Sequence, residues 1–342
     1  MIHKKRKPIK ISPAIAILIA LFYLPGCISL VPLSDTVQSE IENALDRGFD
    51  GIIVYVDQGG DTANYAAGWK NRENRIPADP QSLFKIASIS KLYIAAAATK
   101  LINNDSLSLD RTLAEYLPEY ANRIENSQGI TLRMMLQHRS GIPDYIDHPD
   151  FPWTEPPLGI DDALDIVLDM PADFDPDKKY QYSNTNYLLI GEILDRILGY
   201  SHHQYIKREI LWPLELYDTY GALSEVNLDE VMSGYFLGYD PDIKQNDYQI
   251  PGGSMLATAQ DVGVFLRALI DGSLLNTDEQ AIYSSIYKYE HTGELPGYQS
   301  IARYHEEIDA VVIQFINTSG GSSWSKSESV YRRIVRILER NN

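Results

Sequence analysis

Cysteine, positive charge and the usual metal-binding patterns are all scarce in this sequence. Cys27 is the single cysteine among 342 residues, which excludes a disulfide framework and any metal site built from cysteines. Neither H-E-x-x-H, typical of zinc hydrolases, nor G-x-S-x-G, typical of Ser-His-Asp hydrolases, occurs. Lys and Arg number 30 against 47 Asp and Glu, and such a balance disfavours nucleic acid as a partner. We therefore expect no metal and no cofactor.

The N-terminus has the layout of an export signal. Five Lys and Arg residues lie in the first ten positions, and an almost wholly apolar run follows at 14–24. This run is too short to cross a bilayer but suits the core of a signal peptide. It ends in Leu24-Pro25-Gly26-Cys27, which resembles the lipobox of a bacterial lipoprotein. We expect residues 1–26 to be removed and Cys27 to be lipidated, with 27–34 as a tether; an ordinary signal peptide with an incidental cysteine is the alternative.

Export of this kind would place the mature chain on a membrane surface. Removing residues 1–26 takes away five of the 30 basic residues and none of the acidic ones, which moves the net charge from −17 to −22. Residue 28 is Ile rather than Asp, which favours the outer membrane if the cell is Gram-negative. We expect a protein anchored by lipid to a bacterial membrane, on its periplasmic or cell-surface face.

The order of apolar patterns predicts a mixed fold in which the two ends of the chain meet. A helix is predicted at 36–47, and strands at 51–57 and 63–69 are joined through a glycine-rich hairpin turn. A mostly helical region follows. Further strands are expected at 281–290, 300–304 and 310–317, before a closing helix at 327–340. We expect an α/β (α+β) sandwich domain from 35–80 and 251–342, with a mostly helical domain inserted at 81–250.

The stretch FKIASISKLYIAAAATKL, residues 84–101, combines two serines with one lysine. It is rich in alanine and leucine and reads as a helix. Ser88 and Lys91 are three residues apart and share a helical face, whereas Ser90 and Lys91 point about 100° apart. Ser88 would lie in the first helical turn, where free N–H groups favour developing negative charge. The geometry suits an activated serine nucleophile.

The bare Ser-x-x-Lys pattern recurs three times, so context must separate the copies. The pairs 82/85 and 323/326 lie in predicted loops, and the pair 285/288 lies in a predicted strand, where residues three apart face opposite sides. Only Ser88 opens a long apolar helix.

Two more short patterns carry groups suited to catalysis. Tyr182 and Asn184 flank Ser183 ahead of an apolar helix; a phenol can relay protons and an amide can hold a carbonyl. His291 and Gly293 lie on a predicted strand, where glycine lets a substrate approach the backbone. Alone, the first pattern would read as an Asn-rich turn and the second as a structural histidine.

Together and in this order, the three patterns resemble the serine β-lactamase and penicillin-binding-protein family. That family carries S-x-x-K, then Y-x-N, then K-T-G or H-x-G. The resemblance is greatest to the branch of class C β-lactamases and D-alanyl-D-alanine carboxypeptidases, with its related esterases. LQHRSGIPDY at 136–145 and PGGSMLATAQDV at 251–262 also match, and the resemblance covers about residues 35–340.

The resemblance implies an antiparallel sheet flanked by the N- and C-terminal helices, and an active site in the cleft beside the helical domain. Ser88 would attack a carbonyl carbon and form an acyl-enzyme, which water then releases. Lys91 and Tyr182 would share the proton transfer, and either could be the base. Asn184 would orient the substrate amide.

The family pattern also assigns the far wall of the cleft and one structural histidine. His291, Thr292, Gly293 and Glu294 would bind the substrate, with the backbone N–H groups of residues 88 and 294 as the oxyanion hole. His138 would be structural, bonding the loop around residues 141–143.

Two departures from the family pattern narrow the substrate. His291 replaces a lysine, and a neutral imidazole offers a carboxylate no permanent cation. Glu294 replaces a small residue, and if its carboxylate faces the cleft, an anionic substrate at about 4 Å is opposed by about 4 kcal/mol at an effective dielectric near 20; a carboxylate turned to solvent is the other possibility. We expect a neutral ester, an amide or a small peptide of D-amino-acid or D-Ala-D-Ala type, with the cell wall as one source. A β-lactamase, or a weakly catalytic penicillin-binding sensor, are the alternatives.

Overall fold

Strand β1 (Gly51–Gln58) lies inside a six-stranded sheet to which both ends of the chain contribute. The computed structural model describes residues 32–149, 151–152 and 159–342. β1 pairs antiparallel with β2 (Asp61–Asn71) on one side and with β10 (Ala310–Ile316) on the other. The strand order is β3-β2-β1-β10-β9-β8, where β3 is Ile76–Pro77, β9 is Tyr298–His305 and β8 is His291–Leu295. Every neighbouring pair is antiparallel, and the predicted fold class is confirmed.

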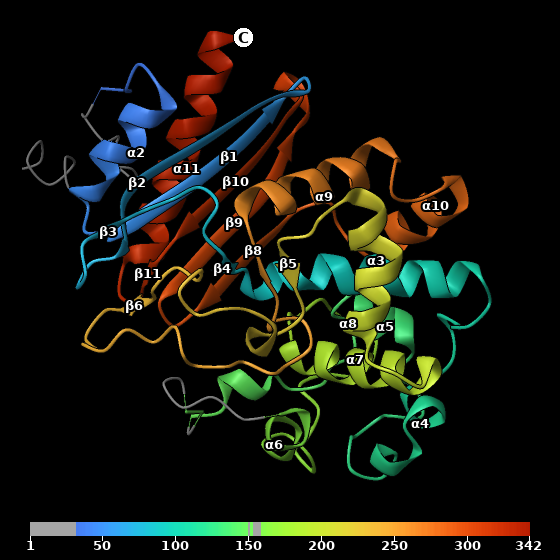
Figure 1. The fold of residues 1–342 in the computed structure, drawn as a ribbon. Coiled ribbons are helices and arrows are strands. Elements are labelled where there is room, and N and C mark those ends of the chain that lie inside the picture. Colours follow the sequence, from blue (N-terminus) through green and yellow to red (C-terminus); the bar gives the residue numbers. More distant parts are fainter. Residues whose placement is uncertain (1–31, 150, 153–158) are drawn as a thin grey trace, which may run out of the picture. The chain divides into compact units, whose positions relative to one another are not determined.

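Helices cover both faces of this sheet, which explains why β1 reads as a continuous apolar run. Helix α2 (Val37–Leu45) and the C-terminal helix α11 (Ser323–Asn341) lie on one face, and α9 (Ala259–Asp271) lies on the other (Figure 1). All of β1 except its last residue is buried, as expected for a strand covered on both sides. The buried Arg333 of α11 binds Glu40 of α2 at 2.6 Å between Nε and Oε1, which ties the two terminal helices together.

The remaining helices lie mainly between residues 90 and 206. The longest are α3 (Ser90–Asn103) and α7 (Asn184–Leu198), and the shorter ones are α4 (Leu113–Tyr116), α5 (Leu132–Leu136), α6 (Ile160–Asp165) and α8 (His202–Ile206). Helix α3 is almost wholly buried, and its small alanine side chains allow neighbouring elements to pack closely around it. Residues Asp35–Asn342 form one compact unit, so a domain boundary near residues 80 and 250 stays a prediction.

The short strands tie this helical region to the rest of the chain. β4 (Phe84–Lys85) and β5 (Thr219–Tyr220) both pair with β7 (Leu256–Ala257) in a small antiparallel sheet. β4 directly precedes the turn that carries Ser88, and β7 directly precedes α9. The residues just before α3 are therefore held beside β7, the strand that leads into α9 on the main sheet.

The predicted strand at 281–290 is wrong. Residues Thr277–Ile286 form helix α10, and strand β8 begins only at His291. The helix begins with a capping box: Asn276 Oδ1 accepts from Glu279 N at 3.0 Å, and Glu279 Oε2 accepts from Asn276 N at 2.9 Å. This capping box precedes the Ile and Tyr residues that favoured a strand, and it begins a helix that includes them.

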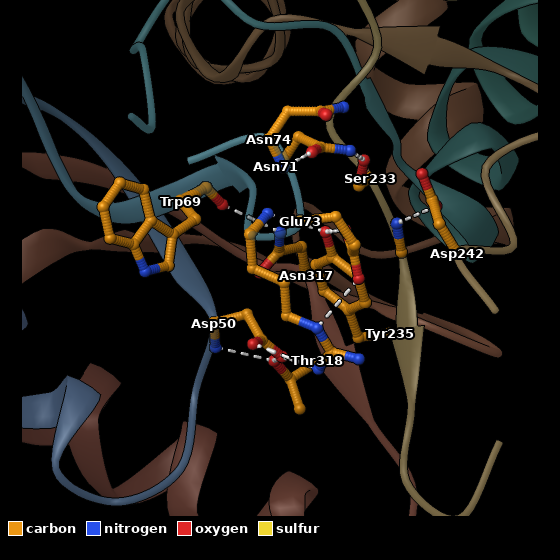
Figure 2. Close-up of polar contacts among 12 residues, drawn as sticks. Asp50, Trp69, Asn71, Glu73, Asn74, Ser233, Tyr235, Asp242, Asn317 and Thr318 are labelled. Atoms are coloured by element: carbon orange, nitrogen blue, oxygen red, sulfur yellow. Dashed lines mark hydrogen bonds and ion pairs between the residues drawn. The ribbon is translucent and has the colours of Figure 1, made fainter. Parts of the chain in front are cut away.

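A polar network fixes the long segment that follows residue 230 against the sheet (Figure 2). Strand β6 (Tyr235–Phe236) pairs in parallel with β11 (Thr318–Ser319). The Tyr235 hydroxyl donates to Glu73 Oε2 at 2.6 Å and accepts from the backbone N–H of Arg72 at 2.9 Å, and Asn71 Nδ2 donates to Ser233 Oγ. The network holds the start of a segment whose later part, around residues 248–253, reaches the candidate active site.

The N-terminal predictions fall outside this description. The signal peptide at 1–26, the lipidated Cys27 and most of the tether at 27–34 lie before residue 32, where the described residues begin. From residue 32 onward, within the described ranges, the helices are too short or too polar to serve as membrane spans.

Candidate active site

Ser88 lies on a tight turn just before α3. Residues Ala87–Ile89 form a 3-10 turn, and α3 begins at Ser90, two residues later than the sequence suggested for its first turn. Ala87 has a φ of 50°, a left-handed conformation that is costly for any residue with a Cβ. The strained residue therefore directly precedes the predicted nucleophile.

The neighbouring Ser90 is excluded as the nucleophile by its own contacts. It is fully buried, and its Oγ donates to the backbone oxygen of Ala87 at 2.6 Å. Ser90 closes the turn, whereas the hydroxyl of Ser88 lines a cavity.

Lys91 points its amine at Ser88. Lys91 Nζ lies 2.9 Å from Ser88 Oγ, 2.8 Å from Asn184 Oδ1 and 2.9 Å from the backbone oxygen of Gly252. The side chain is 1% exposed. Burial lowers the pKa of Lys91 to about 7, although the nearby carboxyl of Asp144 acts in the opposite direction. A large share of this amine is therefore uncharged at neutral pH.

Tyr182 also contacts Ser88. Its hydroxyl lies 2.9 Å from Ser88 Oγ. Burial raises the pKa of the Tyr182 phenol, against the hydrogen bond with Ser88, which lowers it. The tyrosine thus keeps its proton at neutral pH and can donate a hydrogen bond to Ser88.

His138 supports the loop that carries Tyr182. Its ring stacks on the Tyr182 ring at 4.4 Å between centroids, and its Nδ1 accepts from the backbone N–H of Ser183 at 3.2 Å. Burial, followed by the charge of Lys91, lowers the pKa of His138 to about 3, so the ring is neutral. The imidazole therefore bonds the loop at 182–183 rather than the loop around residues 141–143, where the sequence had placed its contact.

Asn184 is held by the protein at both ends of its amide. Its Oδ1 accepts from Lys91, and its Nδ2 donates to Asp144 Oδ2 at 2.9 Å. Burial raises the pKa of Asp144 to about 6, although hydrogen bonds from Asn184 and Ile146 and the charge of Lys91 oppose this rise. Asn184 is thus a bridge between a buried amine and a buried carboxyl.

Strand β8 forms the opposite wall, and Gly293 allows it to approach the turn of Ser88. A Cβ on Gly293 would lie 2.4 Å from the backbone oxygen of Ile86 and 2.9 Å from Ala87 Cβ. Ser300 of the neighbouring strand also donates its Oγ to Ile86 O at 2.9 Å. A side chain at 293 would push the strand and the turn apart.

The carboxylate of Glu294 lies on the other side of this strand. Because side chains alternate along a strand, Glu294 faces away from the side on which Gly293 meets the Ser88 turn. Its Oε1 accepts from Gln299 Nε2 at 3.0 Å, and the same amide nitrogen donates to Ser323 at the start of α11. The side chain of Glu294 is exposed and lines the same cavity as Ser88.

His291 is buried and uncharged. Burial, and then the charge of Lys91, hold the pKa of His291 well below its usual range. Its ring lies parallel to the Tyr287 ring, with 6.0 Å between centroids. The wall thus offers a neutral imidazole at the position that the family pattern gives to lysine.

These side chains surround a cavity of about 350 Å³. Of the predicted residues, Ser88, Tyr182, Asn184, His291, Thr292 and Glu294 line it, while Lys91 and Gly293 lie directly behind this lining. Apolar and aromatic side chains form most of the remaining wall, among them Tyr145, Ile146, Phe151, Tyr248, Ile250 and Leu295. Such a pocket suits a small organic substrate with a few polar groups.

Two residues that contact Lys91 or Asn184 were not predicted. Asp144 lies within the segment 136–145 whose resemblance to the family was noted, and a carboxylate in that segment was the available signal. Gly252 acts through its backbone oxygen and has a φ of 76°; a Cβ there would lie 3.1 Å from Lys91 Cγ. The Gly-Gly pair at 252–253 was the available signal.

The paired histidines at 202 and 203 are engaged elsewhere. His202 Nδ1 pairs with Asp195 Oδ1 at 2.7 Å, and His203 Nε2 lies 3.3 Å from Ser254 Oγ. Over residues 32–149, 151–152 and 159–342, no three His, Cys, Asp or Glu side chains gather where they could hold a metal ion.

Comparison with known proteins decides the family. The Beta-lactamase family model matches residues 37–333. The chain belongs to the Beta-lactamase family. The predicted relationship is therefore confirmed, as is the assignment to serine hydrolases of this type.

Individual relatives fall on the penicillin-binding, amidase and β-lactamase sides of the family. The chain is 26% identical over 321 residues to a putative penicillin-binding protein, PbpX, of Bacillus subtilis, covering 87% of this chain and 78% of that one. Several other curated relatives are longer, and the chain spans about half their length.

Solved structures share the fold. The D-amino acid amidase of Ochrobactrum anthropi, complexed with L-phenylalanine amide, superposes with a TM-score of 0.78 at 21% identity, over 89% of this chain and 98% of that one. A class C β-lactamase of Rhodobacter sphaeroides superposes with a TM-score of 0.69 at 18% identity, over 90% and 99% of the two chains.

Proposed function

We propose that this Beta-lactamase-family protein is an extracytoplasmic serine hydrolase that forms an acyl-enzyme on Ser88. Its substrate is an amide, a small peptide of D-amino-acid or D-Ala-D-Ala type, or an ester. One observation carries the proposal: Ser88 Oγ lies 2.9 Å from both Lys91 Nζ and the Tyr182 hydroxyl, on the wall of a cavity. A nucleophile within reach of two proton-transfer groups is the arrangement that acyl transfer needs.

Lys91 is the base in this proposal. A neutral amine has two N–H donors and one lone pair, and Lys91 has three neighbours at hydrogen-bond distance. It donates to Asn184 Oδ1 and Gly252 O, and its lone pair accepts the Ser88 proton. A pKa of about 7 is close to the optimum for a general base at neutral pH. The raised pKa of Tyr182 makes that phenol the acid instead.

The proton balance follows from these roles. Ser88 Oγ forms a bond to the carbonyl carbon of the substrate while its proton moves to Lys91. The bond to the leaving group then breaks, and the leaving atom takes a proton from Tyr182, which regains one from Lys91. In the second half, water attacks the acyl carbon while its proton moves to Lys91. The ester bond to Ser88 Oγ then breaks, Ser88 Oγ takes this proton back, and the carboxylic acid product is released.

The surrounding groups position these side chains and stabilise charge. The backbone N–H groups of Ser88 and Glu294 form the oxyanion hole. This arrangement requires β8 to lie close to the Ser88 turn, and Gly293 permits that approach because it has no side chain. Asp144 and Asn184 hold Lys91 in place. Asn184 therefore acts by holding Lys91 in place as well as by contacting the substrate directly.

The family relatives support amide or peptide hydrolysis, but one feature of the site also fits a β-lactam as the substrate. The neutral His291 offers no permanent cation to the carboxylate of a β-lactam. However, Glu294 accepts a hydrogen bond from Gln299 on the next strand, which holds its carboxylate and weakens the repulsion expected of a free carboxylate in the cleft. Hydrolysis of β-lactams is therefore the second candidate, and slow acylation without turnover, as in a sensor, is the third.

A single panel separates these candidates. A fluorescent fluorophosphonate should label the protein but not Ser88→Ala. Turnover is then compared for nitrocefin, a D-Ala-D-Ala peptide, a D-amino-acid amide and a p-nitrophenyl ester. Turnover of the peptide, amide or ester above nitrocefin supports the proposal, and preferential turnover of nitrocefin supports a β-lactamase. Stable acylation by penicillin without turnover indicates a sensor, and no labelling of Ser88 refutes all three.

The extracytoplasmic location is a separate proposal that rests on the N-terminal sequence. Cys27 is lipidated and becomes the N-terminus when residues 1–26 are removed, and the lipid holds the protein on a bacterial membrane, close to cell-wall-derived substrates. Incorporation of radiolabelled palmitate into the wild type but not into Cys27→Ser tests this. Equal release of both forms into the soluble fraction would contradict it.

A further inference from the structure

A second cavity adjoins the first one across the wall that contains Tyr182. It has a volume of about 380 Å³. Three residues line both cavities, namely Tyr182, Lys288 and His291. The second cavity therefore adjoins the first and shares part of its wall.

The proposed chemistry assigns this side of the site to the leaving group. Tyr182 gives its proton to the leaving atom, so the leaving part of the substrate lies beside the Tyr182 hydroxyl. From there the second cavity is the adjoining space. Apolar and aromatic side chains make up much of its wall, with Leu136 and Ile286 buried and Tyr180 and Tyr287 beside them. A cavity of this size and lining accepts an apolar or aromatic side chain.

Lys288 brings positive charge to the boundary between the two cavities. It follows α10 by two residues, and its backbone oxygen accepts from the Tyr283 hydroxyl at 2.9 Å, which fixes the link between α10 and β8. Its charge contributes, after burial and Lys91, to the lowered pKa values of both His138 and His291. The amine of Lys288 therefore acts electrostatically on both sides of the shared wall.

The nearby carboxylates have partners other than Lys288. Glu290 pairs with Arg303 at 3.6 Å, Glu294 accepts from Gln299, and Asp144 accepts from Asn184. Within the part of the chain that the structure describes, no carboxylate pairs with Lys288. Its charge is therefore available to an anionic group of a bound molecule.

We propose that Lys288 binds a free carboxylate on the leaving part of the substrate, while the second cavity takes the side chain of that part. The preferred substrate is then a peptide whose terminal residue carries an apolar or aromatic side chain and a free carboxylate, rather than an amino-acid amide or a simple ester. The cation that the family pattern places at residue 291 is supplied from residue 288. This inference rests on the proposed function of Ser88 and specifies its substrate.

The charge is tested with two peptides that differ in one group. N-acetyl-D-alanyl-D-phenylalanine and its C-terminal amide are compared by kcat/KM. Lys288 is exposed, and an exposed ion pair corresponds to about 1.5-fold to fivefold in binding. The ratio of acid to amide should therefore fall by about 1.5-fold to fivefold in Lys288→Gln, through KM. Lys178→Gln removes the same charge from an exposed position that lines neither cavity, and its ratio should equal that of the wild type.

The second cavity is tested with a matched pair of serines on α10. Ser284 lines the second cavity, whereas the exposed Ser285 lines neither. The wild type should prefer D-phenylalanine over D-alanine as the terminal residue. Ser284→Trp should reduce this preference by about tenfold because the indole occupies the cavity, and Ser285→Trp should retain it.

Three outcomes would overturn the inference. An acid-to-amide ratio in Lys288→Gln equal to that of the wild type refutes the role of the charge. A preference unchanged in Ser284→Trp, or lowered equally in Ser285→Trp, refutes the role of the cavity. If the protein is still labelled by the fluorophosphonate at Ser88 and still hydrolyses a p-nitrophenyl ester, each of these outcomes leaves the proposed function intact. Absence of that labelling would refute the function and this inference together.

Discussion

Replacing Asp144 by asparagine should move the acidic limb of the pH–rate profile to lower pH. If neutral Lys91 is the base, kcat/KM rises with pH as Lys91 loses its proton and levels off above a pKa of about 7. The charge of Asp144 stabilises the ammonium form and so raises the pKa of Lys91. Asparagine has nearly the same shape and can still accept from Asn184, but it carries no charge. Its introduction should therefore lower the pKa of Lys91 further.

The structure sets the size of this effect. Lys91 Nζ lies 2.8 Å from Asn184 Oδ1, and Asn184 Nδ2 lies 2.9 Å from Asp144 Oδ2. The two atoms of the Asn184 amide are about 2.2 Å apart, so the two charges are separated by at most about 8 Å. At an effective dielectric near 20 this corresponds to about 2 kcal/mol, or a shift of about 1.5 pH units.

Coupling between the two groups determines the shape of the limb. Burial raises the pKa of Asp144 to about 6, close to that of Lys91, so the limb of the wild type belongs to the pair rather than to one residue. Asp144→Asn leaves one titrating group of this pair. The limb should then become a simple single-proton curve as well as moving to lower pH.

The measurement is kcat/KM for a p-nitrophenyl ester from about pH 5 to about pH 9, together with the rate of fluorophosphonate labelling over the same range. Labelling reports the first chemical step alone. Asp105→Asn, in an exposed turn, changes the charge equally and should leave the limb in place. A limb that stays at its original pH in Asp144→Asn, or moves to higher pH, would show that Lys91 is not the base.

Three further predictions follow from the same geometry. Gly293→Ala should lower kcat/KM by about a hundredfold because the new Cβ, 2.4 Å from Ile86 O, displaces the oxyanion donors; Gly129→Ala, with its nearest contact at 3.6 Å, is the matched control, and equal effects would contradict this reason. Tyr182→Phe should reduce turnover of an amide by about a hundredfold more than turnover of a p-nitrophenyl ester, because only the amine needs a proton to leave; an equal loss for both would remove Tyr182 as the acid. The pKa of Lys91 is about 7 in the folded protein, against a usual value of 10.5. Between these two pH values the unfolded chain binds more protons than the folded protein. The free energy of unfolding should therefore rise with pH in this range, by up to about 1.4 kcal/mol per pH unit. Urea unfolding at several pH values should show that Lys91→Met loses this part of the rise, and an identical slope would mean that Lys91 is charged in the folded protein.

Local sequence reasoning was sufficient where a contact depends on one element. The three-residue spacing of Ser88 and Lys91 predicts their contact because helical geometry fixes it, even though α3 begins two residues later than expected. The hairpin of β1 and β2 follows from two apolar segments around a glycine-rich turn. The match to the family pattern then brought residues 182 and 291 to the same cleft, which spacing alone could not do.

The contacts that were missed join segments far apart in the sequence. Asp144 meets Asn184 across 40 residues, and Gly252 meets Lys91 across 161 residues. Gly252 contributes a backbone oxygen, which every residue has, so no residue type marks its role. The orientation of Glu294 depended on the pleat of β8 and on Gln299 of the next strand. These features depend on tertiary packing, which a single sequence does not display.

The site gathers several departures from the local rules that favour stability. Ala87 adopts a left-handed conformation, Lys91 is buried as an amine with a lowered pKa, and Asp144 is a buried carboxyl with a raised pKa. Each of these is unfavourable alone, because it strains the backbone or removes a charged group from water. All three lie within the same cluster of contacts around Ser88, beside the almost wholly buried helix α3. The unfavourable features are those that make a serine reactive: a turn that presents its hydroxyl, an amine that can accept its proton, and a carboxyl that tunes that amine. The packed core offsets their cost, and for this reason residues chosen for stability alone would not produce this arrangement.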